Sequence, residues 1–351
     1  MKKISIIIPC YNVSDLVYDS WNSIKNQTMD LSDIECIFID DASTDDGLTW
    51  KMLNKIEEEA PESVKIIHSD ENMRQGGARN IGLQYAEGEY LMFLDADDMY
   101  RSDACMSLYQ KAKAGDYDII QSKHNMVGEL GEKKSNNGKS AGDIQEKAYE
   151  LSDDNIRMMF LINAIGDFGC TNKFYKMKLV KEAAVHFAEH VIYEEPLFVY
   201  PLFAYADNVL ITEEAYYQYN LHEGSTMTSE LGTHLMEHPY VQLLLIEDMI
   251  TREDVYKKYY YAIMLHFIHS YYTETLLFAR VNRGANLELS YFHEMQNICL
   301  KLFPDYKSNP ILKSVSPYVQ RAAESIEEKI ETQEDFLQLL DDVARAAGVV
   351  A

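Results

Sequence analysis

Apolar residues recur through the first hundred positions as short continuous runs, each of which stops abruptly at polar or acidic residues. Three such runs, at 4–8, 34–39 and 90–94, have the length and apolar character of strands buried on both faces. A shorter one covers 64–68. Segments with helical signals separate them, at 15–24, at 48–59 and up to residue 86. This alternation with short links predicts a doubly wound, mostly parallel α/β sheet.

The pattern changes in the later part of the chain. Residues 128–142 are rich in Gly, Lys, Ser and Asn, which is typical of an exposed loop or hairpin. From about residue 232 the apolar spacing becomes helical, for example across 319–330 and 336–343. We therefore expect an α/β domain over 1–230 and an all-α region over 231–351.

Composition narrows the possible partners and compartment. The 351 residues are 47% hydrophobic and carry a net charge of -25, which argues against nucleic acid as the main partner. Five scattered cysteines without a CxxC pair indicate reduced, mostly buried thiols in a cytosolic protein. The apolar stretch at 259–272 contains two histidines and is too short for a membrane helix, for which about 20 residues are needed.

Polar side chains gather where three of the predicted strands end, at 9–12, 40–41 and 95–98. Ligands of open α/β sheets bind just outside the carboxyl ends of the strands, so these groups should share one site. The cluster Asp95-Ala96-Asp97-Asp98 concentrates negative charge that a divalent cation would neutralise, and oxygen ligands suit Mg²⁺ or Mn²⁺. Taken alone, the same residues could equally form a solvated acidic turn before a helix.

The three strand ends together suggest a site for a nucleoside diphosphate with a metal ion. Asp41 could accept a ring N–H of a base, and Tyr11 could stack on it. Asp97 would hold the metal at the diphosphate, and Arg79 would contact a phosphate or carboxylate. Each residue also has an ordinary structural interpretation: Tyr11 as a packing aromatic, Asp41 as a helix cap and Arg79 as a surface ion-pair partner.

Five motifs occur in a characteristic order. They are Ile-Ile-Ile-Pro-Cys-Tyr-Asn at 6–12, Ser-Ile-Lys-Asn-Gln-Thr at 23–28, Ile-Asp-Asp-Ala-Ser-Thr-Asp-Asp-Gly at 39–47, Gly-Ala-Arg-Asn-Ile-Gly-Leu at 77–83, and Gly-Glu-Tyr-Leu-Met-Phe-Leu-Asp-Ala-Asp-Asp at 88–98. The ordered set resembles the family 2 glycosyltransferases, which have the GT-A fold. The resemblance is dense over 1–100 and thinner to about 228, and it implies a nucleotide-sugar half at about 1–100 and an acceptor half at about 101–230.

The resemblance implies roles for matching positions. Asp41 would line the base and ribose pocket, Arg79 would lie near the diphosphate, and Asp97 would ligate Mn²⁺ or Mg²⁺ with support from Asp98. The donor-binding set implied is Pro9, Tyr11, Asn12, Asp40, Asp41, Arg79, Asp95 and Ala96. The metal set implied is Asp97, Asp98 and His222, the last from a flexible loop, although a lone histidine is more often structural.

On the acceptor side, Asn172-Lys173-Phe174-Tyr175 resembles the family's segment ahead of the catalytic base, and 193–198 resembles its acidic motif. The usual pair there is Glu-Asp, whereas this chain has Glu194-Glu195. The catalytic set implied is Glu195 and Glu194, with Glu195 as the candidate base. The extra methylene of Glu195 puts the register of base and acceptor in question. The alternative is an acidic pair that merely starts a helix before Pro196.

The resemblance implies an inverting transfer from a nucleoside-diphosphate sugar, with UDP favoured, to a hydroxyl of a glycan or lipid-linked acceptor in bacterial surface polysaccharide synthesis. We expect a cytoplasmic protein without a transmembrane span. Peripheral association with the inner face of the membrane and homo-oligomerisation through the helical region are both left open. The alternatives are a non-catalytic sugar- or nucleotide-binding scaffold and a metal-dependent nucleotidyltransferase.

Overall fold

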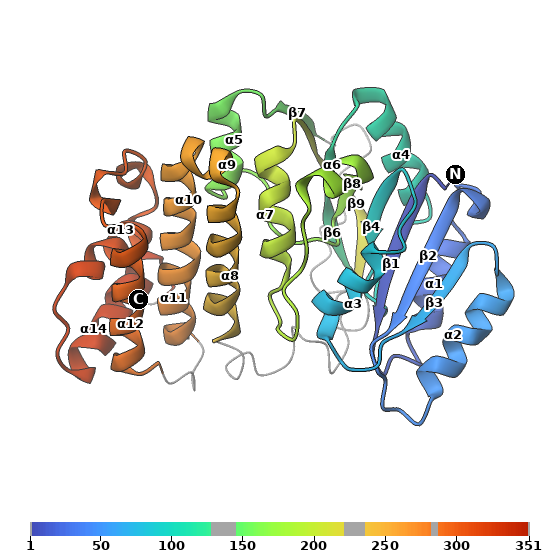
Figure 1. Cartoon of the computed structure of the whole chain (residues 1–351), viewed down its shortest axis with the longest axis horizontal. Coiled ribbons are helices and arrows are strands. Elements are labelled where there is room, and N and C mark those ends of the chain that lie inside the picture. Colours follow the sequence, from blue (N-terminus) through green and yellow to red (C-terminus); the bar gives the residue numbers. More distant parts are fainter. Residues whose placement is uncertain (1, 128–144, 221–235, 282–286, 350–351) are drawn as a thin grey trace. The chain divides into compact units, whose positions relative to one another are not determined.

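The computed structural model describes residues 2–127, 145–220, 236–281 and 287–349 (Figure 1). The chain divides into two compact units. We call them the sheet unit, which is 1–157 with 166–225, and the helical unit, which is 158–165 with 226–351. The boundary expected near residue 230 lies within 221–235, outside the described residues.

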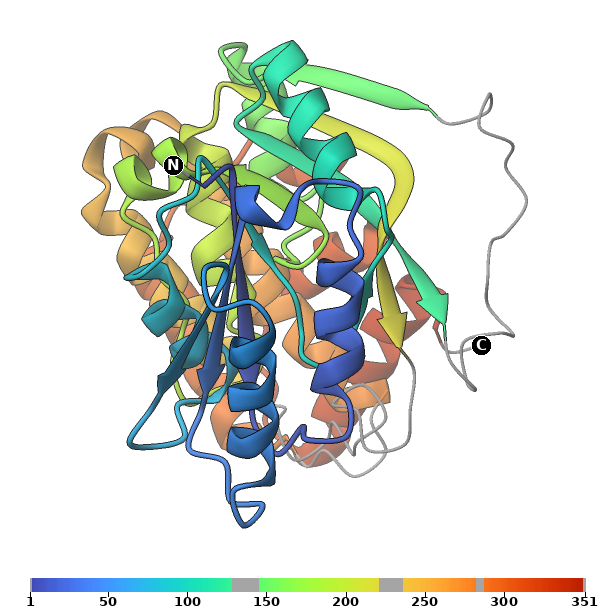
Figure 2. The same cartoon turned by 90° about the vertical axis from the view of Figure 1, so that its right-hand side faces the viewer.

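The first half of the sheet is wholly parallel. Its strands are β1 (Ile4–Cys10), β2 (Ile34–Asp40), β3 (Val64–His68) and β4 (Tyr90–Phe93), in the order β3-β2-β1-β4 (Figure 2). After β1, the chain adds β2 and then β3 on one side of it. β4 then pairs with the other side of β1, so the strand order reverses at β1. Cys10 pairs with Asp40 and Ile7 with Phe93, which brings the carboxyl ends of the three strands to one edge of the sheet.

The second half of the sheet is mixed. β8 (Lys173–Lys176) runs antiparallel to β4 and to β6 (Ile119–Val127). β9 (Asn208–Asn220) is parallel to β6 and antiparallel to β5 (Met99–Tyr100) and β7 (Glu146–Glu150). The predicted fold class is confirmed: a mixed, mostly parallel sheet flanked by helices, followed by a helical C-terminal region.

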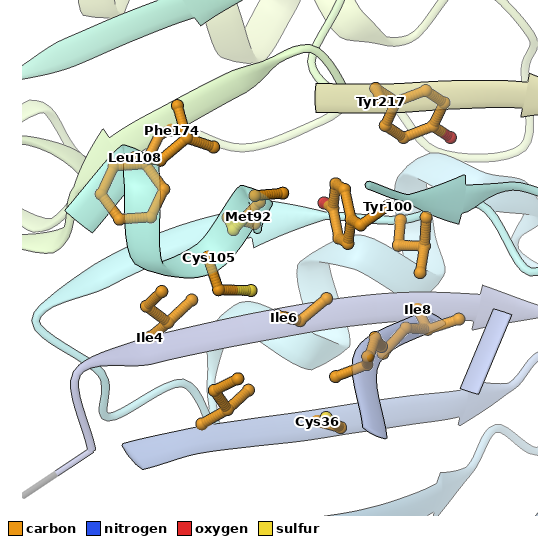
Figure 3. Packing of buried hydrophobic residues seen from close by; sticks show 14 of the residues in the cluster. Ile4, Ile6, Ile8, Cys36, Met92, Tyr100, Cys105, Leu108, Phe174 and Tyr217 are labelled. Atoms are coloured by element: carbon orange, nitrogen blue, oxygen red, sulfur yellow. The ribbon is translucent and has the colours of Figure 1, made fainter. Parts of the chain in front are cut away.

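Helices cover both faces of the sheet, which explains why every residue of β1 is buried. They are α1 (Val17–Lys25), α2 (Leu48–Glu59), α3 (Arg74–Leu83), α4 (Ala104–Gly115), α6 (Met177–Ala183) and α7 (Glu195–Tyr205), and α5 (Asp154–Leu161) follows β7 in the chain. Figure 3 shows Ile4, Ile6 and Ile8 in a row along β1, in the same cluster as Met92 of β4 and Cys105 of α4. Alternate strand residues point to opposite faces, so Ile7 instead meets α3, where a Cβ on Gly82 would come within 2.5 Å of it.

The cysteines contribute to packing, as expected. All five are free and buried, and Cys36 and Cys105 belong to the cluster just described. Burial raises the pKa of the Cys36 and Cys105 thiols, so both stay protonated and inert at neutral pH.

The helical unit contains α8 (Glu237–Thr251), α9 (Glu253–Lys258), α10 (Tyr260–Phe267), a π-helical segment at Ile268–Thr273, α11 (Glu274–Val281), α12 (Leu289–Leu302), α13 (Pro317–Glu324) and α14 (Gln333–Ala346). The predicted apolar face of 336–343 is buried in α14. The predicted helix across 319–330 was too long. It ends at Glu324, because the Ser325 hydroxyl donates to the Ala322 carbonyl and a 3-10 turn follows.

The stretch 259–272 forms the core of the helical unit. Tyr259, Tyr271 and Tyr272 are buried there. In the described residues, no helix combines the length and the apolar character that crossing a bilayer requires.

Three histidines surround one carboxylate in the helical unit. His238 lies 3.4 Å from Glu274, and His269 lies 4.0 Å from it and 3.0 Å from the Tyr318 hydroxyl. Burial, then the neighbouring His269, lowers the pKa of His266 to about 3, although Glu274 opposes this. Burial also lowers the pKa of His269. His266 and His269 therefore favour the neutral imidazole in the folded state.

This cluster predicts acid sensitivity of the helical unit. His266 takes up its proton near pH 6.5 when unfolded but only near pH 3 when folded, so its contribution to stability is lost as the pH falls below about 6.5. In His266→Phe, the loss of unfolding free energy between pH 7.5 and 5.5 should be smaller by about 1 kcal/mol, measured by urea denaturation. His186→Phe, which changes an exposed histidine of the sheet unit, is the control. An undiminished acid loss in His266→Phe would contradict the prediction.

Candidate active site

Two loops lie together where β1 and β2 end. Pro9 is a buried residue of β1, and Tyr11 and Asn12 follow in the turn to α1. The Asn12 side-chain oxygen accepts the Thr44 N–H at 2.7 Å, and its amide nitrogen donates to the Thr44 hydroxyl at 3.2 Å. Tyr11 stays 43% exposed beside this pair, so its ring can stack on a planar base.

Asp40 and Asp41 are both buried at the end of β2 but have different surroundings. Asp40 accepts the Ser43 N–H at 3.2 Å and lies 3.0 Å from Nδ1 of His68. Asp41 accepts the Met73 N–H at 2.9 Å, and burial raises the pKa of its carboxyl. Asp40 thus organises its own loop, whereas Asp41 is a desolvated carboxylate suited to a specific N–H donor.

The acidic turn after β4 is held from two sides. The Ser20 hydroxyl of α1 lies 2.7 Å from the carbonyl oxygens of both Ala96 and Asp98. The buried Asp98 carboxylate accepts the Tyr217 hydroxyl at 2.5 Å and the Asn220 N–H at 2.8 Å. The Tyr217 oxygen also accepts the Asp95 N–H at 3.3 Å. Both Asp98 oxygens already accept hydrogen bonds from the protein, so Asp98 is better suited to supporting the turn than to binding a metal ion directly.

The turn has a surplus of negative charge. Burial, then the charges of Asp95 and Asp97, raises the pKa of Asp98 to about 8. Across the described part of the chain, no three His, Cys, Asp or Glu side chains converge as a complete metal site. Magnesium-type ions at nucleotide sites take one or two carboxylates and fill the remaining positions with phosphate oxygens and water. The half-buried Asp97 could supply one carboxylate to such a shared site. His222 lies outside the described residues.

Arg79 links the end of β4 to the start of α7. Its side chain is 1% exposed, its Nη2 donates to Asp95 at 2.7 Å, and its Nη1 donates to Glu194. The Phe187 and Phe93 rings lie 5.4 and 6.0 Å from the guanidinium carbon. Arg79 is therefore a buried ion-pair centre, and its predicted contact with the donor diphosphate stays a prediction.

The two glutamates of the acidic pair are held differently. Glu194 is 4% exposed; burial raises the pKa of its carboxyl, while the ion pair with Arg79 opposes that rise. Glu195 is the first residue of α7, half-buried, and its Oε1 accepts the Cys170 N–H at 2.6 Å. The helix N-terminus also favours a carboxylate at that position. Of the pair, Glu195 has the surroundings expected of a base that solvent and substrate can reach.

Three further residues hold these groups, and sequence reasoning gave them no role. Tyr217 donates a hydrogen bond to Asp98. Lys173, the first residue of β8, forms an ion pair with Asp167, which precedes the strand. Lys173 did carry a signal, because a lysine at the start of a buried strand needs a partner. The segments around Lys173 and Tyr217 were noticed only for their resemblance to family motifs.

A parallel sheet with ligand-type side chains at the point where its strand order reverses defines a nucleotide-binding α/β class of protein. Residues 5–183, just over half of the chain, match the family Glycosyl transferase family 2. The chain belongs to this family, and the resemblance read from its motifs is confirmed.

Characterised relatives point the same way. The poly(ribitol-phosphate) beta-glucosyltransferase of Bacillus spizizenii is 30% identical over 219 residues, which are 62% of this chain and 32% of that protein. TarP of Staphylococcus aureus, a poly(ribitol-phosphate) beta-N-acetylglucosaminyltransferase, is 34% identical over 129 residues, 36% of this chain and 38% of that protein. The matched parts of this chain span only about a third of the length of these relatives.

Solved structures share the fold over almost the whole chain. S. aureus TarS 1–349 in complex with UDP-GlcNAc superposes with a TM-score of 0.55 at 19% identity, covering 99% of this chain and 84% of that one. The mannosyltransferase PcManGT from Pyrobaculum calidifontis, in complex with GDP-Man and Mn²⁺, gives 0.50 at 16% identity and covers 94% and 88%. The expected GT-A fold is confirmed.

The Arg79 ion pairs predict a large effect on stability. Arg79→Met leaves Glu194 buried without its cation, which should lower the free energy of unfolding by about 3–5 kcal/mol. Removing both charges in Arg79→Met/Glu194→Leu should restore part of that loss, as measured by urea denaturation.

Lys113→Met is the matched control, because its ion pair with Glu89 is solvent-exposed and exposed ion pairs contribute little to stability. Equal losses in Arg79→Met and Lys113→Met would show that the buried ion pair does not have the importance assigned to it.

Proposed function

We propose that this protein is a metal-dependent, inverting glycosyltransferase that moves a sugar from a nucleoside-diphosphate sugar to a hydroxyl group. The observation that carries the proposal is the ion-pair chain Asp95–Arg79–Glu194, which links the acidic turn of the donor side to the helix start that bears Glu195. Inverting transfer needs a base on one side of the sugar and stabilisation of the leaving group on the other. The two ion pairs of Arg79 connect the segments that would supply these two functions.

The donor side would recognise the nucleotide through groups at the ends of β1 and β2. Tyr11 would stack on the base, and Asp41 would accept its ring N–H. Asp95 would contact the ribose or the sugar. A bound Mn²⁺ or Mg²⁺, held by Asp97 in a turn supported by Asp98, would neutralise charge on the leaving diphosphate.

Glu195 would act as the general base. Its carboxylate takes the proton of the acceptor hydroxyl, whose oxygen attacks the anomeric carbon from the face opposite the leaving diphosphate. The bond to the diphosphate oxygen breaks as the new glycosidic bond forms, so the configuration inverts and no sugar is attached to the protein. Positive charge develops on the sugar ring, as in glycoside cleavage.

The relatives guide the choice of substrates. One neighbouring structure holds UDP-GlcNAc. WfaP of Escherichia coli, 42% identical over 102 residues, is a UDP-Glc:alpha-D-GlcNAc-diphosphoundecaprenol beta-1,3-glucosyltransferase, and others act on poly(ribitol-phosphate). We propose a UDP-linked hexose or N-acetylhexosamine donor and a glycan or lipid-linked acceptor of the bacterial surface. For a lipid-linked acceptor, we propose a cytoplasmic protein that meets the inner face of the membrane.

The test is a screen of UDP-sugars by thermal shift with Mn²⁺, followed by assay of transfer and donor hydrolysis. A donor present at 100 times its Kd should stabilise the fold by about 2.7 kcal/mol. Asp97→Asn should lose the Mn²⁺-dependent part of this stabilisation and its turnover. Glu195→Gln should keep the stabilisation but lose about 10²–10⁴-fold in turnover.

Asp116→Asn, which changes an exposed carboxylate paired with Lys176, is the control and should behave as the unmodified protein. Full turnover in Glu195→Gln would exclude Glu195 as the base. Donor binding without any turnover in the unmodified protein would instead support the non-catalytic scaffold.

A further inference from the structure

A lysine ammonium is buried behind the candidate base. Lys173, the first residue of β8, has a side chain with no exposed surface. Its Nζ donates to the Asp167 carboxylate at 2.6 Å, the Gly169 carbonyl at 2.6 Å and the Asn172 side-chain oxygen at 2.9 Å. These three acceptors use all three donors of the ammonium group. Burial lowers the pKa of Lys173, and the Asp167 charge opposes that change.

The segment that Lys173 holds is tied at further points. The Asp167 carboxylate also accepts the Gly169 N–H at 3.0 Å, the Gln121 side-chain amide at 2.8 Å and the Asn172 side-chain amide at 3.0 Å. Although burial raises the pKa of Asp167, the Lys173 ammonium produces a net lowering. Asp167 is therefore charged and fully engaged, and the backbone from 167 to 172 has little freedom.

The next amide of this segment contacts the base. Cys170 donates its N–H to Oε1 of Glu195 at 2.6 Å, and this contact lies outside the strand pairing of β8. A buried ion pair is seldom more stable than apolar packing of the same volume, so stability alone does not explain a lysine here. The contact between Cys170 and Glu195 does explain the lysine. The Lys173 ammonium fixes the Gly169 carbonyl, and the next amide along the chain, that of Cys170, orients Glu195.

We propose that Lys173 is a positioning residue that holds the Cys170 amide against Glu195, and that this arrangement is fitted to a glutamate. The inference rests on the proposed function, in which Glu195 is the base. An aspartate at 195 would withdraw the carboxylate by about 1.5 Å, which would stretch the contact beyond the range of a hydrogen bond. The length of the Glu195 side chain would then be matched by this segment.

The experiment compares Lys173→Met, Asp167→Asn and Glu195→Asp with the unmodified protein. Two quantities are measured: hydrogen exchange of the Cys170 amide by NMR, and kcat with donor KM for transfer. We expect exchange at Cys170 to become at least tenfold faster and kcat to fall at least tenfold in all three variants, with donor KM within twofold. A merely structural role would not split kcat from KM in this way.

Lys176→Met is the matched control, because Lys176 lies in the same strand and pairs with Asp116 and Asp118 at the surface. It should change neither quantity. Asp167 is half-exposed, so Asp167→Asn should fold even if Lys173→Met does not.

Unchanged exchange at Cys170 in the variants would overturn the proposal, and so would faster exchange with unchanged kcat. If the unmodified protein binds and transfers no nucleotide sugar, the proposed function fails. The exchange measurement alone then decides whether Lys173 holds the Cys170 amide against Glu195.

Discussion

The buried guanidinium of Arg79 is the constraint around which the site is arranged. A charge removed from water must be balanced nearby, and here two carboxylates from distant parts of the chain provide the balance. One belongs to the turn after β4 and the other to the start of α7. The backbone of α3 lies so close to the segment before α7 that a Cβ on Gly76 would come within 1.9 Å of the Ala188 carbonyl oxygen. The glycine-bearing segment before Arg79 therefore serves packing and charge balance as well as any contact with a ligand.

The carboxylates at this edge of the sheet divide into two groups. Asp40, Asp98 and Glu194 are buried, and hydrogen bonds or ion pairs within the protein engage them. Asp97 and Glu195 are only half-buried. The buried group holds the loops and the start of α7 in place, whereas the half-buried pair keeps some contact with solvent. Neighbouring acids in the sequence thus have different tasks, and burial decides which task each has.

Strands and their ends could be predicted because they depend on local sequence. A continuous apolar run followed by polar or acidic residues identifies β1, β2 and β4 without knowledge of the fold. Parallel pairing then brings their ends to one edge. The partners of the acids could not be predicted in this way. Arg79 and Glu194 are 115 residues apart, and Tyr217 and Asp98 are 119 apart. Only tertiary packing brings such residues together. The end of α13 at Glu324 was missed for a local reason, since a serine can replace helical hydrogen bonds with one of its own.

The short segment 158–165 has a consequence for how the protein can be divided. Although it lies between two stretches of the sheet unit, it belongs to the helical unit. The chain therefore passes from one unit to the other three times, and no single cut separates them. A fragment ending at 225 would keep Phe160 and Leu161, both buried in the intact chain, without the rest of the unit to which they belong. A truncation at this boundary therefore carries a cost in stability that the order of the elements along the chain does not reveal.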